Sequence, residues 1–382
     1  MKKFLKNLPT VFFVAFIFIM TILFFALPKK EYSSAEKRYL SDFPKLSVDT
    51  FFSGDFGEDF ETYLSDHTAF RQFWVGLNSY YNLSLGNPLS NGIYHCKDGY
   101  LVNDPPVTDR FDTNIDIIAE FASKTDLPST MVLAPSTGYV ANDVLPNNHI
   151  VYHDDELVES AKETLKENGV SFVDLRSEFK EAYRNGAQLY YKTDHHWTTS
   201  GAHLAYCNLS DKMGFKANNK DNFEITSYDD FYGTTYSSSG YWLTKPDVIE
   251  VWQSKSLKDS ELSISIADGK NSVESTSMFF LDNLKDDDKY PVFLDGNHPY
   301  TLIENKTLKE SGNNKKLLII KDSFAHSLTP FLADHYSEIV MIDMRYYKEK
   351  VSQLIENEKF TEILFVYSID NLGSDTDIAW LE

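Results

Sequence analysis

An uncharged stretch near the N-terminus most constrains how this chain can fold. No charged side chain lies between Lys6 and Lys29, and the intervening segment LPTVFFVAFIFIMTILFFALP is dominated by Phe, Ile, Leu and Val. A helix of about 20 apolar residues spans the hydrocarbon core of a bilayer. Because Lys2 and Lys3 precede the stretch and basic residues mark the cytoplasmic side, the remaining chain is expected outside the membrane. We therefore interpret residues 1–30 as a cytoplasmic stub and a transmembrane anchor.

A cleavable signal peptide is the alternative interpretation of this stretch. Its apolar region would be shorter, and cleavage after Ala26 would need a small residue at the position that Phe24 occupies. We favour an uncleaved anchor. The protein is then expected in the cell membrane, crossing it once, with its C-terminal domain extracytoplasmic.

The chain beyond the anchor is strongly acidic. Five of the 36 basic residues precede Glu31, so 31 remain against 57 acidic residues, a formal net charge of −26. This argues against nucleic acid as a partner, because its phosphates attract basic surfaces. It also disfavours an anionic polymer as substrate, although a local basic patch can override net charge. Cys96 and Cys207 could pair in an oxidising exterior, but two unpaired core residues are the favoured interpretation.

The middle and the end of the sequence alternate between helical and strand-like segments. The apolar runs 130–135 and 315–320 are typical of buried strands, whereas 156–169 has helical periodicity and a glycine past its end. Such alternation predicts an α/β fold with a mainly parallel sheet and helices on its faces.

One extracytoplasmic domain is expected over residues 31–382. Its first part is aromatic and acidic, with Phe56, Phe60 and Leu64 at the spacing of an amphipathic helix near the membrane. Residues of about 216–289 break the later alternation with Ser, Asp, Tyr and Gly. We interpret them as an insertion of loops and β-segments.

Two short motifs carry residues suited to acyl chemistry. In KLLIIKDSFAHS, a buried strand runs through Asp322 and Ser323 into a helix, so Ser323 would lie where backbone N–H groups can stabilise an oxyanion. Taken alone, either residue is more simply a helix cap. The TDHHW motif favours a catalytic role over a helix cap, because a serine nucleophile needs a base and the base needs an orienting acceptor. At two-residue spacing Asp194 and His196 can point the same way, while His195 points elsewhere.

Two other interpretations compete for TDHHW. One is a metal site of Asp194, His195 and His196, which is weakened because no further cysteine or histidine lies at a recognisable ligand spacing. The other is a structural turn in which Trp197 packs and the histidines are merely hydrogen-bonded. With Ser323 available we assign Ser323 as nucleophile, His196 as base and Asp194 as its orienter, with no metal and no cofactor. The residues Thr198, Thr199 and Ser200 are candidate caps of the helix that follows.

The combination of TDHHW with a later strand and DSF resembles the DHHW proteins of bacteria, which are related to the SGNH hydrolase-like domains of alginate O-acetylation proteins. The resemblance extends over FSGDFGEDFETYLSDHTAFR, KDGYL, VLAPSTGYV, FYGTTYSSSG, VFLDGNHPY and IDMR. It implies a three-layer α/β/α fold of the SGNH hydrolase-like type and the same triad of Ser323, His196 and Asp194. The chain departs from the pattern at Lys321, where many SGNH proteins have the glycine that permits close approach of a substrate.

The resemblance also implies residues on the substrate side of the site. These are Arg345 in IDMR and Tyr367 in FVYS, and we add Trp197 of TDHHW as a substrate contact. For Arg345 and Tyr367 the alternative is an ordinary surface or packing role at the end of a strand. Asn297 in DGN is a candidate oxyanion donor, although a simple turn role is the favoured interpretation.

Motifs, anchor and resemblance together predict a membrane-anchored serine O-acetyltransferase that acts on a cell-surface polysaccharide. A membrane-bound O-acyltransferase is the expected acetyl source, and the role would lie in exopolysaccharide biosynthesis. A polysaccharide O-acetylesterase of the same mechanism is one alternative, because transfer and hydrolysis differ in whether water reaches the site. A non-catalytic glycan-binding or assembly protein is another, since a fold can persist without turnover.

Overall fold

The computed structural model describes residues 2–268 and 271–381, and within them the chain forms two compact units. The first unit runs to Asn91 and includes Ser237–Leu243. The second comprises Gly92–Tyr236 and the chain from Thr244 onward. Residues 31–91, expected as the start of the main domain, thus belong to the first unit.

The first unit is built from helices. Its N-terminal helix α1 (Lys2–Ala26) contains the apolar segment Asn7–Ala26, which is long and apolar enough to cross a membrane. The amphipathic helix expected around Phe56 is α3 (Asp55–Asp66). The other elements of this unit are α2 (Val48–Ser53), α4 (Arg71–Ser84), β1 (Tyr32–Ser33), β2 (Arg38–Tyr39) and β3 (Leu89–Ser90).

The second unit is organised around one mixed sheet. In the described part of the chain the strand order is β11-β10-β12-β14-β13-β15-β6-β7, and the last five of these strands run parallel. The strands β12, β10 and β11 extend the sheet in antiparallel fashion. The parallel strands are β6 (Ser129–Ala134), β7 (Ser171–Val173), β13 (Lys316–Lys321), β14 (Glu338–Ile342) and β15 (Glu362–Ser368). The antiparallel strands are β10 (Leu262–Asp268), β11 (Asn271–Ser275) and β12 (Tyr300–Asn305).

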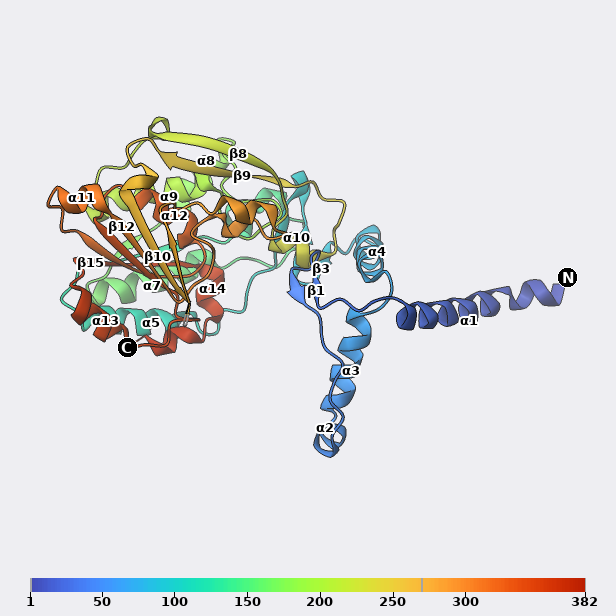
Figure 1. Cartoon of the computed structure of the whole chain (residues 1–382). Coiled ribbons are helices and arrows are strands. Elements are labelled where there is room, and N and C mark those ends of the chain that lie inside the picture. Colours follow the sequence, from blue (N-terminus) through green and yellow to red (C-terminus); the bar gives the residue numbers. More distant parts are fainter. Residues whose placement is uncertain (1, 269–270, 382) are drawn as a thin grey trace. The chain divides into compact units, whose positions relative to one another are not determined.

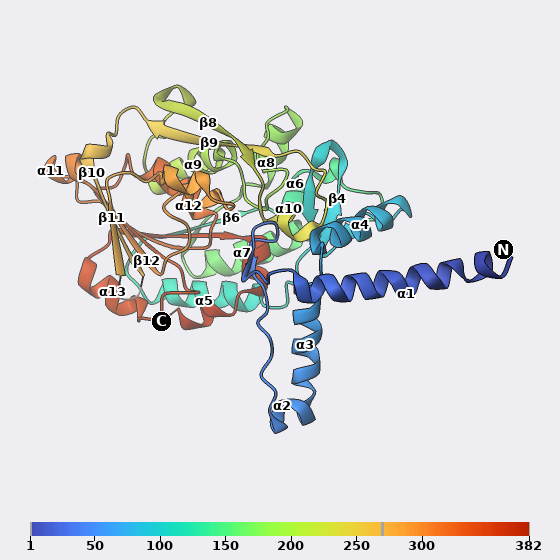
Figure 2. The ribbon, with the colours of Figure 1, turned by 45° about the vertical axis from the view of Figure 1, so that its right-hand side comes forward.

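Helices cover both faces of this sheet, which gives three layers (Figures 1 and 2). On one side lie α5 (Phe111–Ser123), α7 (Asp154–Glu167), α13 (Val351–Glu358) and α14 (Ile369–Ser374). On the other side lie α9 (Thr199–Met213) and α12 (Ala325–Leu332), which contact each other. The helix α9 is capped by Thr198, whose hydroxyl accepts a hydrogen bond from the Gly201 amide at 3.2 Å.

The residue pattern explains why the central strands are buried on both faces. Every residue of β6 is buried, and from Leu317 to Lys321 so is β13. Strands covered by helices on both sides are expected to be continuously apolar rather than alternating. Their side chains pack with α5, α7 and α13 into one core that includes Phe111, Leu165 and Phe365.

The strands within the residues expected as an insertion belong to two different sheets. The hairpin of β8 (Phe223–Phe231) and β9 (Asp247–Ser254) forms a separate two-stranded sheet. The strands β10 and β11 instead continue the main sheet. Both cysteines are free thiols, with Cys96 buried and Cys207 half-buried.

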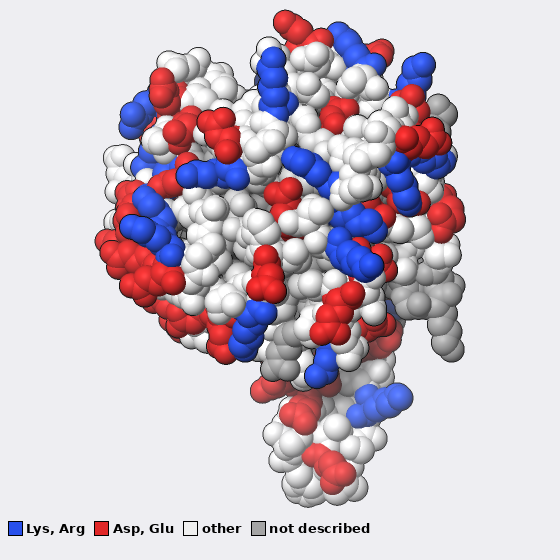
Figure 3. All heavy atoms as spheres, turned by 90° about the vertical axis from the view of Figure 1, so that its left-hand side faces the viewer, with Lys and Arg blue, Asp and Glu red and all other residues white. Residues whose placement is uncertain are grey.

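Shorter elements complete the second unit, and α8 among them was not anticipated from the sequence. They are β4 (Ile93–His95), η1 (Lys97–Gly99), β5 (Leu101–Asn103), α6 (Thr137–Val140), η2 (Asn142–Val144), α8 (Arg176–Arg184), η3 (Lys220–Asn222), η4 (Asp259–Glu261), η5 (Leu281–Lys285), η6 (Tyr290–Val292), α11 (Lys306–Glu310) and η7 (Asp377–Trp380). One further helix, α10, covers Thr234–Ser239. On the face drawn in Figure 3, basic side chains are interspersed among acidic ones.

Two carboxyl groups, those of the buried Asp154 and the half-buried Asp370, meet beyond the carboxyl end of β6. Asp154 accepts a hydrogen bond from the Ser136 amide at 2.7 Å, and the Ser136 hydroxyl donates to Asp370 at 2.6 Å. Burial, with the neighbouring Asp370 charge, raises the pKa of Asp154 to about 7, and burial raises the pKa of Asp370 to about 6. An unfolded aspartate titrates near pH 3.9, so the folded chain binds more protons between these values.

We therefore expect stability to fall as the pH rises from about 4 to about 7, because the folded state must then give up protons that the unfolded state has already lost. Asp154→Asn removes one titrating group. Its free energy of unfolding, relative to wild type, should rise by on the order of 1 kcal/mol per pH unit over this window. Urea titrations at pH 4 and pH 8 measure the difference. The exposed Asp116→Asn is the control, and an equal pH response of both variants would contradict the assignment.

Candidate active site

Ser323 lies in a turn between β13 and α12, and hydrogen bonds to the Asp322 carboxylate hold this turn in place. The Asp322 carboxylate accepts a hydrogen bond from the Phe324 amide at 2.9 Å, which closes the turn. Its second oxygen accepts from the Ser368 amide at 2.7 Å and from the Asn371 side chain at 2.9 Å. These bonds fasten the turn to the end of β15 and the start of α14. Asp322 therefore fixes the backbone around Ser323 and does not serve as a simple helix cap.

The TDHHW segment brings a histidine and a carboxylate to this serine. The Oγ of Ser323 lies 2.6 Å from Nε2 of His196, and Nδ1 of His196 lies 2.5 Å from Oδ1 of Asp194. The second oxygen of Asp194 accepts hydrogen bonds from the amide of Thr234 at 2.8 Å and from its hydroxyl at 3.1 Å. With Nδ1–H donating to the carboxylate, Nε2 is left as the acceptor for the serine hydroxyl. His196 and Ser323, which lie 127 positions apart in the sequence, thus join Asp194 in one hydrogen-bonded relay.

The charge of this relay resides on Asp194. Burial alone would raise the pKa of its carboxyl, but the electrostatic effects of the two histidines and the hydrogen bonds from the His196 ring and the Thr234 amide hold that pKa well below the ordinary value. The carboxyl is therefore ionised at neutral pH. An ionised acceptor at Nδ1 raises the capacity of Nε2 to take a proton from Ser323.

His195 points away from the serine, as its adjacent position suggested. Its Nδ1 lies 2.6 Å from the Thr234 hydroxyl, and its ring stacks obliquely on His196 with centroids 3.8 Å apart. Burial lowers the pKa of His195 to about 4, with a further contribution from the charge of His196. This imidazole is thus neutral at pH 7.

The same three side chains are spaced closely enough to hold a metal ion, with ligand atoms of Asp194, His195 and His196 within 4.8 Å of one another. Each of them already has a protein partner, however. His196 uses both ring nitrogens for Asp194 and Ser323, and His195 uses Nδ1 for Thr234. The donor set therefore fits a proton relay better than a ligand set.

Two residues that the sequence analysis did not identify, Gly233 and Asp247, keep Asp194 in place. A Cβ built on Gly233 would lie 2.1 Å from the Asp194 Cβ, so only glycine permits this approach. The buried carboxylate of Asp247 accepts hydrogen bonds from the Lys192 amide at 2.9 Å, from the Thr193 amide at 2.7 Å and from the Thr193 hydroxyl at 2.6 Å. Asp247 thereby fixes the two residues that precede Asp194.

Aromatic side chains pack around the relay. Tyr290 lies parallel to the His196 ring at 3.8 Å between centroids, and its hydroxyl donates to the Ser323 carbonyl at 3.2 Å. Trp197 donates from Nε1 to the Phe324 carbonyl at 3.1 Å and to the Ser327 hydroxyl at 2.9 Å. The Trp197 side chain is fully buried, so in this structure it supports the serine turn from inside and offers no surface to a substrate.

Arg345 and Asn297 contact each other through a 3.2 Å hydrogen bond from the guanidinium to the Asn297 side-chain oxygen. The guanidinium also forms a bidentate pair with the buried carboxylate of Asp343, at 2.8 and 2.6 Å. Asn297 is exposed and follows two non-glycine residues with left-handed backbone, Leu294 and Asp295. Such a conformation is strained for residues with a Cβ and is concentrated at functional sites.

Lys321 and Tyr367 both point into the interior. The Lys321 ammonium lies 2.9 Å from Asp343 and 2.7 Å from Nε2 of His326. Burial lowers the pKa of Lys321, and the ion pair with Asp343 partly offsets that effect. Its side chain therefore does not fill the space before Ser323 that a glycine would leave open. Tyr367 belongs to the core, and its buried hydroxyl has no hydrogen-bond partner among the described residues.

The fold and the motifs can be set against known proteins. The profile of the DHHW protein family matches residues 169–342, a range that contains Asp194, His196 and Ser323. This segment is therefore similar to the DHHW protein family. No curated protein sequence matches the chain.

Solved structures share the architecture around the DHHW segment. A DHHW family protein from Eubacterium siraeum aligns with a TM-score of 0.63 and 19% identity, over 76% of this chain and 95% of that one. Bacillus cereus PatB1, in a structure with a sulfonyl adduct, aligns with a TM-score of 0.64 and 22% identity, over 76% and 98%. The O-acetyltransferase domain of Pseudomonas putida AlgJ is more distant, with 13% identity, a TM-score of 0.47 and coverage of 76% and 95%. The predicted three-layer α/β/α fold with a mainly parallel sheet is confirmed, and so is the predicted resemblance to the DHHW proteins.

Gly233 supplies a test of the geometry around the DHHW motif. In Gly233→Ala the new methyl group must displace Asp194, and a shift of about 1 Å in such a site costs about 100-fold in rate. The reaction of Ser323 with a sulfonyl fluoride should therefore slow by about that factor, as followed by intact-protein mass spectrometry. Gly57→Ala is the matched control, because nothing lies within 4 Å of its added Cβ. Unchanged labelling of Gly233→Ala would contradict the required close approach.

Proposed function

We propose that the protein is a membrane-anchored, extracytoplasmic serine O-acetyltransferase that acts on a cell-surface polysaccharide. The observation that carries the proposal is the relay from Ser323 through His196 to the ionised Asp194. A serine hydroxyl is a weak nucleophile unless a base accepts its proton, and this arrangement places a base 2.6 Å away.

In the first half of the reaction, Ser323 Oγ attacks the carbonyl carbon of an acetyl ester while His196 Nε2 takes the hydroxyl proton. The imidazolium that forms is stabilised by Asp194. The tetrahedral oxyanion then needs donors. The Ser323 amide has no partner among the described residues, and the side-chain nitrogen of the exposed Asn297 is a second candidate. His196 returns its proton to the leaving alcohol, which leaves the acetyl group on Ser323.

In the second half, His196 removes a proton from the acceptor hydroxyl, whose oxygen attacks the carbonyl carbon of the acetyl-serine. The bond from this carbon to Ser323 Oγ then breaks, and His196 returns the proton to the serine. A sugar hydroxyl as acceptor gives transfer, and water gives hydrolysis. The polysaccharide as acceptor and a membrane-bound O-acyltransferase as acetyl source both rest on the resemblance to alginate O-acetylation proteins. The Arg345 and Asn297 pair is the proposed contact on the substrate side, because the Arg345 side chain remains one-third exposed.

Labelling of the serine tests the catalytic assignment. The full chain is incubated with 4-nitrophenyl acetate, and an acetyl adduct is sought on Ser323 by mass spectrometry. Ser323→Ala should abolish the adduct, and His196→Ala should slow its formation by about 10³-fold or more, since residues of such a relay act as a unit. His195→Ala is the control and should cost far less, because His195 does not contact Ser323. An adduct that persists in Ser323→Ala would sink the enzymatic proposal.

A sugar acceptor added to the same reaction separates transfer from hydrolysis. Acetylated sugar as the main product supports the acetyltransferase, and free acetate alone supports the esterase. Absence of any adduct from the folded protein would instead favour a glycan-binding role.

The proposed topology has its own test. The uncharged segment of α1 follows a basic N-terminus, so the chain from Glu31 onward should lie outside the cell. Protease is added to cells whose outer layers are permeable but whose cytoplasmic membrane is intact. It should digest this part of the chain and leave a cytosolic marker protein uncut. Full protection of the C-terminal part until the membrane is dissolved would contradict the orientation.

A further inference from the structure

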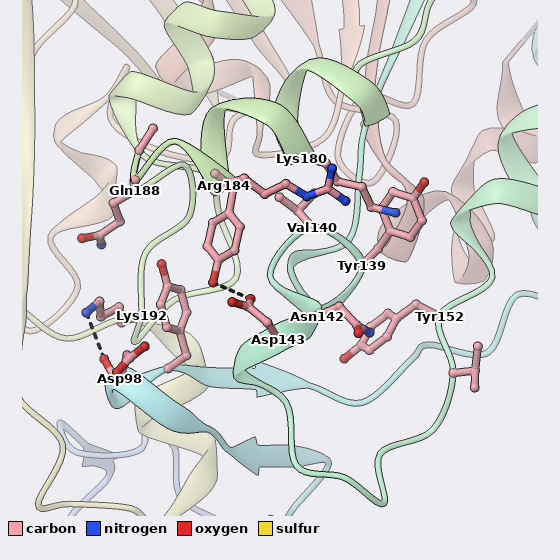
Figure 4. Close-up of a pocket in the computed structure, with 15 residues that line it drawn as sticks. Asp98, Tyr139, Val140, Asn142, Asp143, Tyr152, Lys180, Arg184, Gln188 and Lys192 are labelled. Carbon is pink, nitrogen blue, oxygen red and sulfur yellow. Dashed lines mark hydrogen bonds between the residues drawn. The ribbon is translucent and has the colours of Figure 1, made fainter.

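A second site of interest is a pocket that contains none of the proposed catalytic residues. It has a volume of about 1030 Å³ and lies entirely within the second unit (Figure 4). Its walls come from η1 and Tyr100, from α6 and η2, from the segment of Val151 and Tyr152, and from α8 and the loop that leads to TDHHW. Nothing in the proposed acetyl transfer uses it.

Three basic side chains in this pocket lack an acidic partner. Among the described residues, no carboxylate lies within 4 Å of the cationic groups of Lys180, Arg184 or Lys192. Two carboxylates, those of Asp98 and Asp143, also line the pocket but form no ion pair with these cations. The Lys192 ammonium donates instead to the Asp98 carbonyl, at 2.9 Å.

Lys180 and Arg184 are four residues apart on α8, so they share one face of that helix. Like charges at this spacing destabilise a helix. Figure 4 shows both side chains directed toward the same side of the pocket, beside Tyr139. Burial lowers the pKa of Lys180, and the Arg184 charge lowers it further, although nearby aspartates act in the opposite direction. A bound anion would offset the repulsion between the two cations.

The rest of the lining is rigid and polar. The Lys180 ammonium lies 3.3 Å from the centre of the Tyr139 ring, and the Tyr183 hydroxyl donates to Asp143 at 2.9 Å. The Tyr152 hydroxyl donates to the Asn103 carbonyl. These bonds hold the aromatic walls in place before any ligand arrives, which lowers the entropic cost of binding.

Further hydrogen-bonding groups line the same hollow. The Tyr100 hydroxyl has no protein partner among the described residues. The amide side chains of Asn142 and Gln188 also face the pocket (Figure 4), with their nitrogens bonded to His149 and Asp247 and their oxygens available to a ligand. Only Val140, Val151 and Ala187 offer aliphatic surface. A lining of tyrosine, amide and carboxylate groups suits a ligand rich in hydroxyl groups, because each hydroxyl both donates and accepts.

We propose that this pocket binds an acidic saccharide, a sugar or polyol chain that carries carboxylate or phosphate groups, with Lys180 and Arg184 as its anion-binding pair. The loop that ends the pocket at Lys192 continues directly into Asp194, so the ligand would be held at the entrance to the TDHHW segment. That this ligand is the acetyl acceptor rests on the function proposed above. The binding itself does not.

Binding is measured by isothermal titration calorimetry on the full chain in detergent micelles. The probes are tetragalacturonate, its neutral methyl ester and a glycerol phosphate oligomer. We expect at least one anionic probe to bind, and the methyl ester to bind at least about tenfold more weakly than tetragalacturonate if the carboxylate is the preferred anion. Tighter binding of the phosphate oligomer identifies phosphate as the preferred group. Binding of neither anionic probe overturns the inference, and so does equal binding of acid and ester when the phosphate oligomer binds no more tightly than the ester.

Variants test whether the side chains of Lys180 and Arg184 bind the anionic probe. Replacing both, by Lys180→Gln with Arg184→Gln, should lower the affinity for the anionic probe at least about tenfold. The control, Lys166→Gln with Lys306→Gln, makes the same change in net charge on exposed side chains outside the pocket and should bind as wild type. Should the first pair fail to fold, Lys180→Arg with Arg184→Lys keeps both charges and should retain binding. An equal loss in the control pair would overturn the assignment.

Ser323→Ala separates this inference from the proposed function. It should lose acetyl transfer and still bind the anionic probe with wild-type affinity. Binding without any acetyl transfer by the wild type would defeat the proposed function alone, whereas transfer without binding would defeat the pocket alone.

Discussion

The arrangement of the candidate site depends on one buried, ionised carboxylate. Asp194 is 2% exposed, a position in which a charge is costly unless it is fully hydrogen-bonded. It receives hydrogen bonds from the amide and ring of His196 and from the amide and hydroxyl of Thr234. Because the charge must keep these donors, it determines which nitrogen of His196 carries the proton. Gly233 is required by the same constraint, since it leaves room for the carboxylate.

The sheet brings the other half of the site to this carboxylate. Parallel strands end at the same edge, where the turns after neighbouring strands meet. The turn after β13 carries Ser323, and Asp322 ties it to the turn after β15. Beyond the next strand, β6, Ser136 links Asp154 to Asp370. Hydrogen bonds between turns therefore organise this edge, and small displacements at one of them should be felt at Ser323.

Charge is distributed unevenly over this acidic protein. Lys321 and Arg345 both pair with the buried Asp343 close to the serine turn. In the pocket beside α8, by contrast, Lys180 and Arg184 have no carboxylate partner within the described chain. A net negative charge would repel an anionic polymer at long range, yet a local pair of cations can still capture one acidic group. The acidic composition by itself therefore does not decide which polysaccharide could be bound.

Much of the architecture could be predicted from the sequence. The apolar runs at β6 and β13 and the periodic segment at α7 were found as expected, because core strands and amphipathic helices have patterns local to the chain. The strand β12 and the helix α8 were not predicted. The joining of β10 and β11 to the main sheet was not predicted either, because pairing between distant strands leaves no local signal.

The same division holds for the candidate site. The sequence by itself determined the residue types of the relay and the spacing that lets Asp194 and His196 face the same way, since these are properties of a few consecutive residues. Only the tertiary structure decided that His196 meets Ser323, that Tyr290 stacks on its ring and that Trp197 is buried beneath the serine turn. It also decided that Lys180 and Arg184 open onto a pocket. Each of these contacts joins segments that are separate in the chain, and their distance in space follows from the packing of the whole sheet.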